Sequence, residues 1–489
     1  MFKSFKSILL QSSPSTSSFS RRFQSTTTIF ALSSGSLPSG VAIIRISGPK
    51  SFEALKKLTR QKKDEYFTPK KLFYTKIYDI SETLKDGKNE DEILDHGMAV
   101  WLPVELFLHG SKAVVNAVCN SLAKIENVEA AKAGEFTKRA FFNGKYNISQ
   151  VESLNDLINA ETESQRKLAL KQNKAGKYLE PIREKLINLM AQIQAAIDFG
   201  EDIENQKIDN FSNIAAEILA QLRKFERSAK RGSLIREGIK VAIVGKTNVG
   251  KSSLMNRLAE KDVAIVSNIS GTTRDFLETR LHLNAIPVTV VDTAGIRETA
   301  DLLEKEGIRR SFEKANEANI IVYVFDAKKL FNSFEIEMKE VLPFYNESKE
   351  DGRKVICCIN KADLLEKSEK DELNKKILQY FNDDKSISLI WTSCFEEFGL
   401  STLTSSLKES INDFCNIESD ELVLSRQRHI LLLSDSILEL ELFLENLLFD
   451  QALAAQHLSN AATSIGEISG TIVNEQILDK IFSQFCIGK

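Results

Sequence analysis

Residues 240–252 read Lys-Val-Ala-Ile-Val-Gly-Lys-Thr-Asn-Val-Gly-Lys-Ser. The apolar run up to Val244 predicts a strand, and Gly245–Ser252 matches the pattern G-x-x-x-x-G-K-[ST], with a helix expected over Ser253–Leu258. In this pattern, backbone N–H groups wrap around phosphate oxygens, and the helix N-terminus adds positive potential. We expect Lys251 to reach the outer phosphates and the Ser252 hydroxyl to bind Mg²⁺. The stretch therefore predicts a nucleotide-binding α/β domain.

Three further apolar runs after this loop predict strands of the same domain. The run Val288–Asp292 ends in Asp292-Thr-Ala-Gly295, where Asp292 would support the Mg²⁺ shell and the Gly295 N–H would meet the γ-phosphate. The run Ile320–Phe325 precedes Val355–Ile359, which leads into Asn360-Lys-Ala-Asp363. Asp363 can accept two hydrogen bonds from guanine. Adenine offers no such donors, a mismatch worth roughly 10⁴-fold.

These motifs in this order predict a GTP-binding domain, with Ile390–Cys394 placed as the last guanine-contacting loop. The expected nucleotide contacts are Asn248, Val249, Gly250, Lys251, Ser252, Ser253, Ser267, Asn268, Ile269, Ser270, Gly271, Thr272, Thr273, Asp292, Thr293, Ala294, Gly295, Asn360, Lys361, Ala362 and Asp363.

The residue after Asp-x-x-Gly departs from Ras-like switches, in which a glutamine orients the attacking water. Here that residue is Ile296, so the catalytic polar group comes from elsewhere, and carboxylates in Arg297–Glu304 are candidates. The first switch, Ser267–Asp275, is rich in hydroxyls, and one of its threonines should complete the Mg²⁺ shell. Asn248 has two interpretations: a functional side chain, or a residue that tolerates a tight turn.

Composition places the chain among ordinary globular proteins with several domains. It has 489 residues, of which 42% are hydrophobic and 27% charged, and a net charge of −3. Any contact with RNA must therefore be local. The six cysteines show neither zinc-site nor disulfide spacing, which fits a reducing compartment. No apolar run reaches the length of a membrane helix, so we expect no membrane insertion.

The first 52 residues contain no acidic side chain. Lys3, Lys6, Arg21 and Arg22 lie among many serines and threonines, and the first apolar residues fall at helical spacing. This composition is typical of a transit peptide, so we expect targeting to the mitochondrial matrix and removal of a presequence of about 27 residues. A disordered tail is the alternative.

Periodicity divides the rest of the chain into four blocks. Residues 28–147 mix short apolar runs with Gly and Pro, which is typical of a small α/β domain. Residues 148–235 and 411–489 show apolar residues at helical spacing, and α/β alternation fills 236–410. We expect the two helical segments to bury each other's apolar faces. The fold class is thus α/β plus all-α: an N-terminal α/β domain, and a helical bundle domain with an inserted Ras-like P-loop GTPase domain.

Several motifs together resemble the tRNA-modifying GTPases of the MnmE (TrmE) family. They are Asn248, Gly271-Thr-Thr-Arg-Asp275, Asp292-Thr-Ala-Gly295, Glu304, Val41–Gly48, Gly134–Lys145 and the closing Cys486-Ile-Gly-Lys489. One departure lies before Val104. Met98–Pro103 runs directly into it, where the family carries a Pro-x-Ser-Tyr-Thr-Gly-Glu-Asp stretch.

The resemblance implies roles for residues of the GTPase domain. K⁺ would be bound by Asn248, by the carbonyls of Ser267 and Ile269, and by Thr272, and it would replace an arginine finger when two GTP domains meet. Mg²⁺ would be bound by Ser252 and Thr273, and Glu304 would position the water.

The resemblance also implies cofactors and partners. The N-terminal domain would form a homodimer and bind a tetrahydrofolate one-carbon donor through Arg45, Glu105, Lys145 and Lys489. Cys486 would be a candidate residue for the modification chemistry, with a buried structural cysteine as the alternative. A flavin-dependent partner subunit (MnmG/GidA-like) would carry FAD, and the two proteins would install an aminomethyl-type group on C5 of the wobble uridine of mitochondrial tRNA.

The competing interpretation is a ribosome-assembly GTPase that acts as a binding switch. Such proteins append a KH or similar RNA module. The stretch Gly466–Gly470 does not have the G-x-x-G spacing of a KH loop, and the C-terminal pattern is helical.

Overall fold

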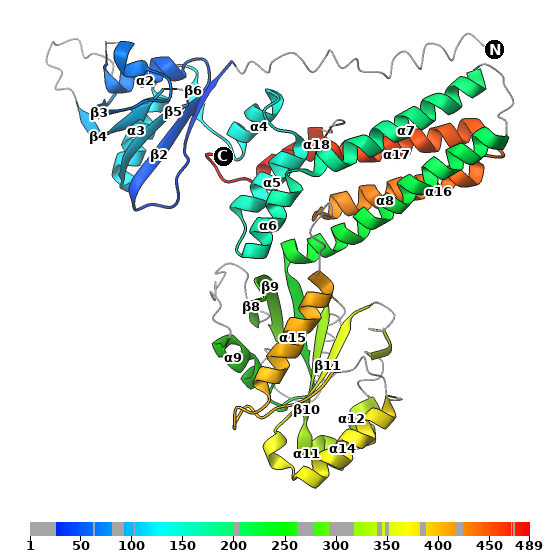
Figure 1. Ribbon diagram of the computed structural model, residues 1–489. Helices are drawn as coiled ribbons and strands as arrows, with labels where there is room; N and C mark the ends of the chain where they lie inside the picture. Colours follow the sequence, from blue (N-terminus) through cyan, green and yellow to red (C-terminus); the bar gives the residue numbers. More distant parts are fainter. Residues whose placement is uncertain are drawn as a thin grey trace, which may run out of the picture. The chain divides into compact units, whose positions relative to one another are not determined.

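The computed structural model describes residues 26–61, 64–80, 92–101, 103–198, 205–261, 277–292, 317–339, 345–347, 352–381, 388–415, 424–470, 472 and 475–489. The chain forms two compact units. One comprises Met1–Asn155 with Ser469–Lys489, and the other comprises Asp156–Ile468 (Figure 1).

The first unit is built on a six-stranded sheet in the order β3-β4-β5-β2-β1-β6. Its strands are β1 (Thr28–Leu32), β2 (Ser39–Ser47), β3 (Leu72–Tyr78), β4 (Ile93–Val100), β5 (Val104–Gly110) and β6 (Val128–Ala130). Neighbouring strands are antiparallel except β1 and β6, which are parallel. The α/β mixture expected for residues 28–147 is therefore confirmed.

Helices α2 (Ser51–Thr59) and α3 (Lys112–Ala123) cover one face of this sheet, and η1 (Asp64–Phe67) lies between α2 and β3 in sequence. Along β2, Ala42, Ile44 and Ile46 are buried at every second position, as a half-covered strand requires. They pack with apolar residues of α2 and α3 into the main core of the unit.

The C-terminal end of the chain belongs to the first unit. Helix α18 (Glu475–Ser483) packs with α4 (Glu135–Phe142) and α5 (Ile148–Ile158) around a small core that contains Phe141, Ile148 and Phe482. Lys138 Nζ lies 2.6 Å from Asp479 Oδ1, which links α4 to α18 across 341 positions of sequence. The segment 411–489, expected as one half of the bundle, thus ends in a part that joins the N-terminal unit.

The second unit contains a helical bundle with two sequence-distant halves. The halves are α7 (Ala175–Asp198) with α8 (Asn205–Glu237), and α16 (Gln427–Asn446) with α17 (Gln451–Ser469). Their apolar side chains form one core, which includes Leu186, Leu222, Leu433, Phe443 and Leu458. The expectation that two half-bundles bury each other's apolar faces is confirmed. Helix α6 (Glu163–Gln172) packs beside α8.

The GTPase part of the second unit has a six-stranded sheet in the order β12-β11-β10-β7-β9-β8. The strands are β7 (Ile239–Val244), β8 (Leu277–Leu283), β9 (Ile286–Asp292), β10 (Ile320–Asp326), β11 (Lys354–Asn360) and β12 (Ser388–Trp391). Only β8 and β9 pair antiparallel. Every residue of β10 is buried, as in parallel strands covered on both faces.

Two groups of helices cover the two faces of this sheet. Helices α9 (Lys251–Lys261) and α15 (Leu400–Cys415) contribute to the core on one face. Helices α11 (Ala327–Asn332), α12 (Phe334–Lys339) and α14 (Lys367–Tyr380) contribute to the core on the other. A short turn, η2 (Ala362–Leu364), follows β11.

The chain enters the GTPase sheet through a sharp end of α8. Gly238 has φ +87° and its N–H bonds to the oxygen of Leu234 at 2.9 Å, so the helix stops and β7 begins. A Cβ at Gly238 would lie 2.8 Å from the backbone oxygen of Pro287. Position 235, the expected end of the first helical block, lies in the last turn of α8. Position 410 lies inside α15, whose Ile411 and Cys415 pack in the GTPase core.

Candidate functional site: the guanine-nucleotide loops

The phosphate loop connects β7 to α9, as the sequence predicts. Gly250 has φ +100°, and a Cβ there would collide with the side-chain amide of Asn360, so only glycine fits. Lys251 is 6% exposed, and its Nζ lies 2.6 Å from the oxygen of Gly245 and 2.7 Å from that of Lys246. These carbonyls hold the ammonium group over the loop, where it can meet phosphate oxygens. Ser252 is exposed at the start of α9.

Asn248 lies in the left-handed region with φ +63°. Asparagine tolerates this conformation better than most residues, so the turn-tolerant interpretation agrees with the geometry. Its side chain is exposed, which leaves it accessible to a ligand. Its backbone oxygen accepts a 2.8 Å hydrogen bond from Lys361 Nζ. The backbone of Asn248 therefore helps to connect the phosphate loop to the guanine-recognition loop.

Hydrogen bonds hold Asn360 at the end of β11 and Asp363 in the turn that follows it. Asn360 is 2% exposed, and its Nδ2 donates to the oxygen of Val249 at 2.8 Å. Ser393 Oγ donates to Asp363 Oδ1 at 2.6 Å, and the Ala362 N–H bonds to the oxygen of Thr392 at 3.0 Å. These bonds fix the Asp363 carboxylate, which the sequence assigned to guanine, against the loop after β12.

An ion pair between Lys361 and Asp326 stabilises the guanine-recognition loop. Lys361 Nζ lies 2.7 Å from Oδ2 of Asp326, which is 6% exposed. Burial alone would raise the pKa of the Asp326 carboxyl. Hydrogen bonds from Lys361 and from the N–H groups of Lys329 and Lys328 outweigh it, so the pKa lies below its ordinary value. The carboxylate is therefore charged at neutral pH and positions Lys361.

A cavity of about 630 Å³ opens between α9 and the guanine-recognition loop. Its lining includes the predicted Gly250, Ser253, Asn360, Lys361 and Asp363. It also includes Cys394 of the predicted last guanine-contacting loop, together with Asn256, Arg257, Glu260, Leu364 and Phe395, which were not among the predicted contacts. Asn256 and Arg257 lie one turn after the motif on α9, so the helical period could have indicated them. Phe395, 89% exposed, follows the predicted last guanine loop.

The closing Cys486–Lys489 segment lies against the sheet of the first unit. Ile487 forms an antiparallel bridge with Ala133, and a Cβ at Gly488 would collide with the backbone oxygen of Leu32. Gly488 has φ +97°, so glycine is required there for two reasons. Cys486 is exposed. The alternative of a buried structural cysteine is therefore wrong for this residue.

Arg45, one of the residues expected to bind folate, lies close to this segment. It pairs with Ala31 of β1, the neighbour of Leu32. Its guanidinium lies 2.9 Å from Glu105 Oε1 and 5.9 Å from the ring centroid of Phe136. Strand β5 follows β4 after only three residues, and Glu105 occupies the position opposite Arg45 on β2. Arg45 and Glu105 thus form an ion pair, which partly neutralises the charge of each side chain.

The other two residues expected to bind folate, Lys489 and Lys145, lie at the end of the C-terminal tail and just after α4. Lys489 is half-buried, and its N–H bonds to the oxygen of Cys486 at 3.3 Å, which closes the tail into a turn. Lys145 is exposed just after α4, and its N–H bonds to the oxygen of Ala140 at 2.9 Å. The structure gives no side-chain contact that brings Lys145 to Arg45.

Family models match nearly the whole chain. Residues 148–486 match the MnmE helical domain, and residues 28–145 match the N-terminus of the GTP-binding protein TrmE. The chain belongs to the MnmE family. Its curated relatives are named tRNA modification GTPase MnmE, so the chain is a GTP hydrolase of tRNA modification. The predicted family and enzyme class are thereby confirmed.

Two relatives illustrate the extent of the match. The MnmE protein of Pelagibacter ubique is 38% identical over 94% of this chain and 100% of its own length. That of Rickettsia typhi is 37% identical over the same shares. Among solved structures, Era of Aquifex aeolicus is 25% identical, covering 41% of this chain and 66% of that chain, with a TM-score of 0.28.

Several predicted site residues of this MnmE-family chain lie outside the described residues. They are Ser267, Asn268, Ile269, Ser270, Gly271, Thr272, Thr273, Thr293, Ala294, Gly295 and Glu304. Asp292 ends β9, where its backbone pairs with Ile243 of β7. The structure therefore brings together the phosphate loop and the guanine-recognition loop, and the switch residues keep the roles expected of them as predictions.

Two further observations concern metal ions and membranes. Among them, no group of three or more His, Cys, Asp or Glu side chains could hold a metal ion. The predicted Mg²⁺ and K⁺ ligands are instead side chains of Ser, Thr and Asn and the backbone carbonyls of Ser267 and Ile269. No helix within the described ranges is long and apolar enough to cross a membrane.

Proposed function

We propose that this chain is a mitochondrial, K⁺-dependent GTPase of tRNA modification. It acts as a homodimer with a flavin-dependent partner that carries FAD. Together they install an aminomethyl-type group on C5 of the wobble uridine of mitochondrial tRNA, and a tetrahydrofolate donor supplies the one-carbon unit. Membership in the MnmE family supports this function, and individual residues of this chain support it further.

The position of Cys486 is the observation that carries the proposal. Its thiol is exposed on a segment that Gly488 and Ile487 seat against β1 and Ala133. A purely structural tail has no need of an exposed thiol, whereas modification chemistry does. Arg45 lies on β2, next to β1, and Lys489 ends the tail. In this proposal both cations would attract the acidic groups of a folate.

The Arg45–Glu105 ion pair limits what the folate proposal can assign. Glu105 is the neighbour that holds the guanidinium of Arg45 at 2.9 Å. A folate carboxylate that binds Arg45 would have to share or displace this contact. The proposal therefore gives Arg45 the role of an anion contact, and it gives Glu105 the role of orienting Arg45.

Asn248 supports the K⁺ dependence together with Ile296. An apolar residue, Ile296, stands where Ras-like proteins have the glutamine that orients the attacking water, so other groups must support catalysis. A bound K⁺ would supply positive charge near the phosphates. The backbone oxygen of Asn248 accepts a hydrogen bond from Lys361 Nζ, and Asn248 is exposed in the phosphate loop. Glu304 would position the attacking water.

The mitochondrial location rests on the N-terminal composition. The match to the family begins at residue 28, and the preceding stretch is basic, Ser-rich and free of acidic residues. A matrix presequence has these properties.

Mass spectrometry of wobble uridines in mitochondrial tRNA tests the proposal. Cells that lack this protein should lose the aminomethyl-type group at C5, and the wild-type gene should restore it. Restoration should fail when residues 1–27 are deleted and succeed when another matrix presequence replaces them. An unchanged set of wobble uridines in cells without the protein would rule the proposal out.

A further inference from the structure

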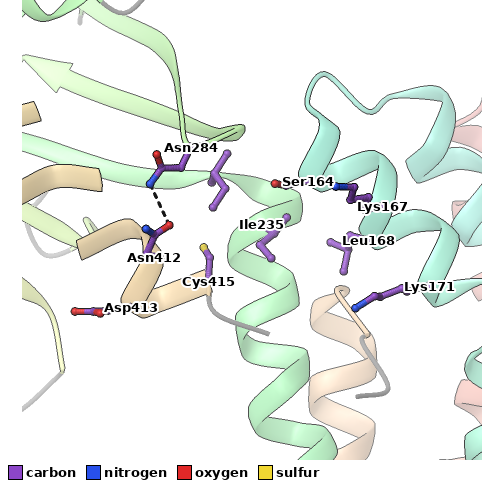
Figure 2. Close-up of a pocket in the computed structure, with 10 residues that line it drawn as sticks. Ser164, Lys167, Leu168, Lys171, Ile235, Asn284, Asn412, Asp413 and Cys415 are labelled. Atoms are coloured by element: carbon purple, nitrogen blue, oxygen red, sulfur yellow. Dashed lines mark hydrogen bonds between the residues drawn. The ribbon is translucent and has the colours of Figure 1, made fainter. Parts of the chain in front are cut away.

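A second cavity, whose lining contains none of the predicted nucleotide contacts, lies in the Asp156–Ile468 unit. Its volume is about 550 Å³. One wall is α6, with Ser164, Lys167 and Lys171, and the opposite wall carries Asn284 of the β8–β9 turn and Asn412 and Asp413 of α15 (Figure 2). The Asp413 carboxylate lies 3.4 Å from Lys354 Nζ. The cavity therefore lies between the helical part and the GTPase part of one unit.

The floor of this cavity is apolar. Leu168, Ile235, Ile286 and Cys415 line it and are between 5% and 8% exposed. Burial raises the pKa of the Cys415 thiol to about 12, so this side chain behaves as a small neutral apolar group. A flat ring placed on this floor would bury apolar surface against it. The volume accommodates a group the size of a nucleobase, since ligand cavities start at roughly 300 Å³.

The amide wall supplies hydrogen-bonding groups beside this floor. Asn284 Nδ2 donates to Asn412 Oδ1 at 3.0 Å (Figure 2). It also donates to the backbone oxygen of Lys408 at 3.1 Å. The bonds described for this pair use the Asn284 donor and the Asn412 acceptor. The side-chain oxygen of Asn284 and the side-chain NH₂ group of Asn412 then remain available to bind a ligand. An acceptor beside a donor complements the edge of a nucleobase.

Positive charge lies along the α6 wall and continues beyond the cavity. The stretch 164–179 contains five basic residues: Arg166, Lys167, Lys171, Lys174 and Lys177. Glu163, just before it, lies 2.7 Å from Arg166 and 3.6 Å from Lys167, so three of the five cations have no ion pair with this carboxylate. All five are exposed. Tyr178, 43% exposed, follows them at the start of α7. In a chain of net charge −3, such a stretch is a local basic patch.

We propose that the cavity and this basic stretch form a binding site for single-stranded RNA. One unstacked base occupies the cavity, with its ring on the apolar floor and its edge on Asn284 and Asn412. Phosphates bind Lys167 and Lys171, and the strand continues over Lys174 and Lys177 towards Tyr178. The inference rests on the proposed function, because it names a surface on which this chain would hold its tRNA.

RNA fits these observations better than a free nucleotide. A mononucleotide would use the cavity and the two lysines at its rim, but it would not extend to Lys174 and Lys177. Recognition of unpaired bases by stacking and edge contacts, with phosphates on basic side chains, is the usual mode for single-stranded RNA. A loop of tRNA offers such unpaired nucleotides.

Binding of a tRNA transcript to the full chain, measured over a range of KCl concentrations, tests this inference. The variant Lys167→Gln/Lys171→Gln should weaken binding roughly tenfold or more near 0.1 M salt. It should also reduce the slope of log affinity against log salt by about 1.4, since each lost phosphate contact contributes about 0.7. The control Lys367→Gln/Lys375→Gln removes the same charge from the exposed face of α14 and should leave affinity and slope unchanged.

A second variant tests the cavity itself. Ser164→Phe places a ring at the cavity rim without a change of charge, so affinity should fall several-fold while the salt slope stays the same. Circular dichroism and the midpoint of thermal unfolding check that each variant is folded. Equal binding by wild type and both variants would overturn the inference. So would a uridine monophosphate affinity equal to that of a uridine pentanucleotide, because the site would then hold a free nucleotide.

Failure of the RNA site and failure of the proposed function give different results in these experiments. If the wild-type gene restores wobble modification in cells but the Lys167/Lys171 variant binds tRNA as the wild type does, the site is wrong and the function stands. If the wild-type gene restores no modification, the proposed function fails whatever the variants show.

Discussion

Asn360 Nδ2 donates a 2.8 Å hydrogen bond to the backbone oxygen of Val249, 111 positions earlier in the chain. The bond joins the end of β11 to the phosphate loop and is buried. It explains the glycine at position 250, where any side chain would collide with the same amide. The base-recognition loop and the phosphate loop are therefore one structural element held by this contact.

Asn360→Ala should lower both stability and GTP affinity. The substitution leaves the Val249 oxygen without its donor in a buried position, at a cost of about 1–3 kcal/mol. Calorimetric titration with GTP and thermal unfolding measure the two effects. The matched control is Asn374→Ala, which removes the 2.9 Å bond from Trp391 Nε1 but does not touch the phosphate loop. A normal GTP affinity in Asn360→Ala would show that the contact has no role in nucleotide binding.

GTP hydrolysis should be rapid in K⁺ and much slower in Na⁺, and Asn248→Ala should erase the difference. Two variants separate the side chain from the turn. At φ +63°, alanine is strained whereas glycine is not. If Asn248→Gly also loses the preference for K⁺, the side chain carries it. If Gly keeps it, only the turn matters. Equal rates of the wild type in the two salts would exclude a K⁺ role.

Glu304→Ala should lower kcat by roughly 10²-fold or more while GTP affinity stays nearly the same. This pattern is expected of a group that acts only in the transition state. Single-turnover hydrolysis in K⁺ and equilibrium binding of a GTP analogue measure the two quantities. Glu298→Ala is the control from the same loop. Unchanged hydrolysis in Glu304→Ala with a loss in Glu298→Ala would move the role to Glu298.

Cys486→Ser should abolish tRNA modification and leave GTP turnover in K⁺ intact. Cys486 is exposed at the end of the first unit, so replacing sulfur by oxygen there should not disturb the core. Mass spectrometry of wobble uridines in complemented cells and GTP turnover of the purified variant are the two measurements. Normal modification by the variant would show that the thiol has no essential role.

Cys486 should have the fastest-reacting thiol of the native protein. Burial raises the pKa of the Cys357 and Cys358 thiols to about 12, so their reactive thiolate forms are scarce near pH 8. Ellman's reagent should show one rapid thiol, which disappears in Cys486→Ser. Cys357 and Cys358 should react only after unfolding in guanidinium chloride. A rapid phase that persists in the variant would contradict the assignment.

Asp156→Ala should destabilise the second unit by about 3–5 kcal/mol. Asp156 Oδ1 lies 3.0 Å from Arg236 Nε and 2.8 Å from Nη2 of Arg426, whose side chain is 9% exposed. Removal of the carboxylate leaves a buried guanidinium without its anion. Urea unfolding measures the loss. Asp413→Ala, which breaks an exposed 3.4 Å pair with Lys354, should cost less than about 1 kcal/mol.

The sequence by itself determined the nucleotide loops and their strands. Gly245–Ser252, Asn360–Asp363 and the runs that became β7, β9, β10 and β11 are local signals, because each motif lies at the end of a buried strand that its own residues specify. It also indicated that the helical blocks on either side of the GTPase part pair with each other, since each has an apolar face that neither can bury alone.

Only the tertiary structure decided where the last residues of the chain belong. Lys138 and Asp479 meet across 341 positions, and Gly488 packs against Leu32. Helical periodicity reports that a helix has an apolar face but not which distant surface covers it, so 411–489 looked like one half-bundle. The Arg45–Glu105 pair and the cavity between α6 and α15 likewise arise from residues far apart in sequence. Their geometry depends on how the packed elements meet, which no local pattern encodes.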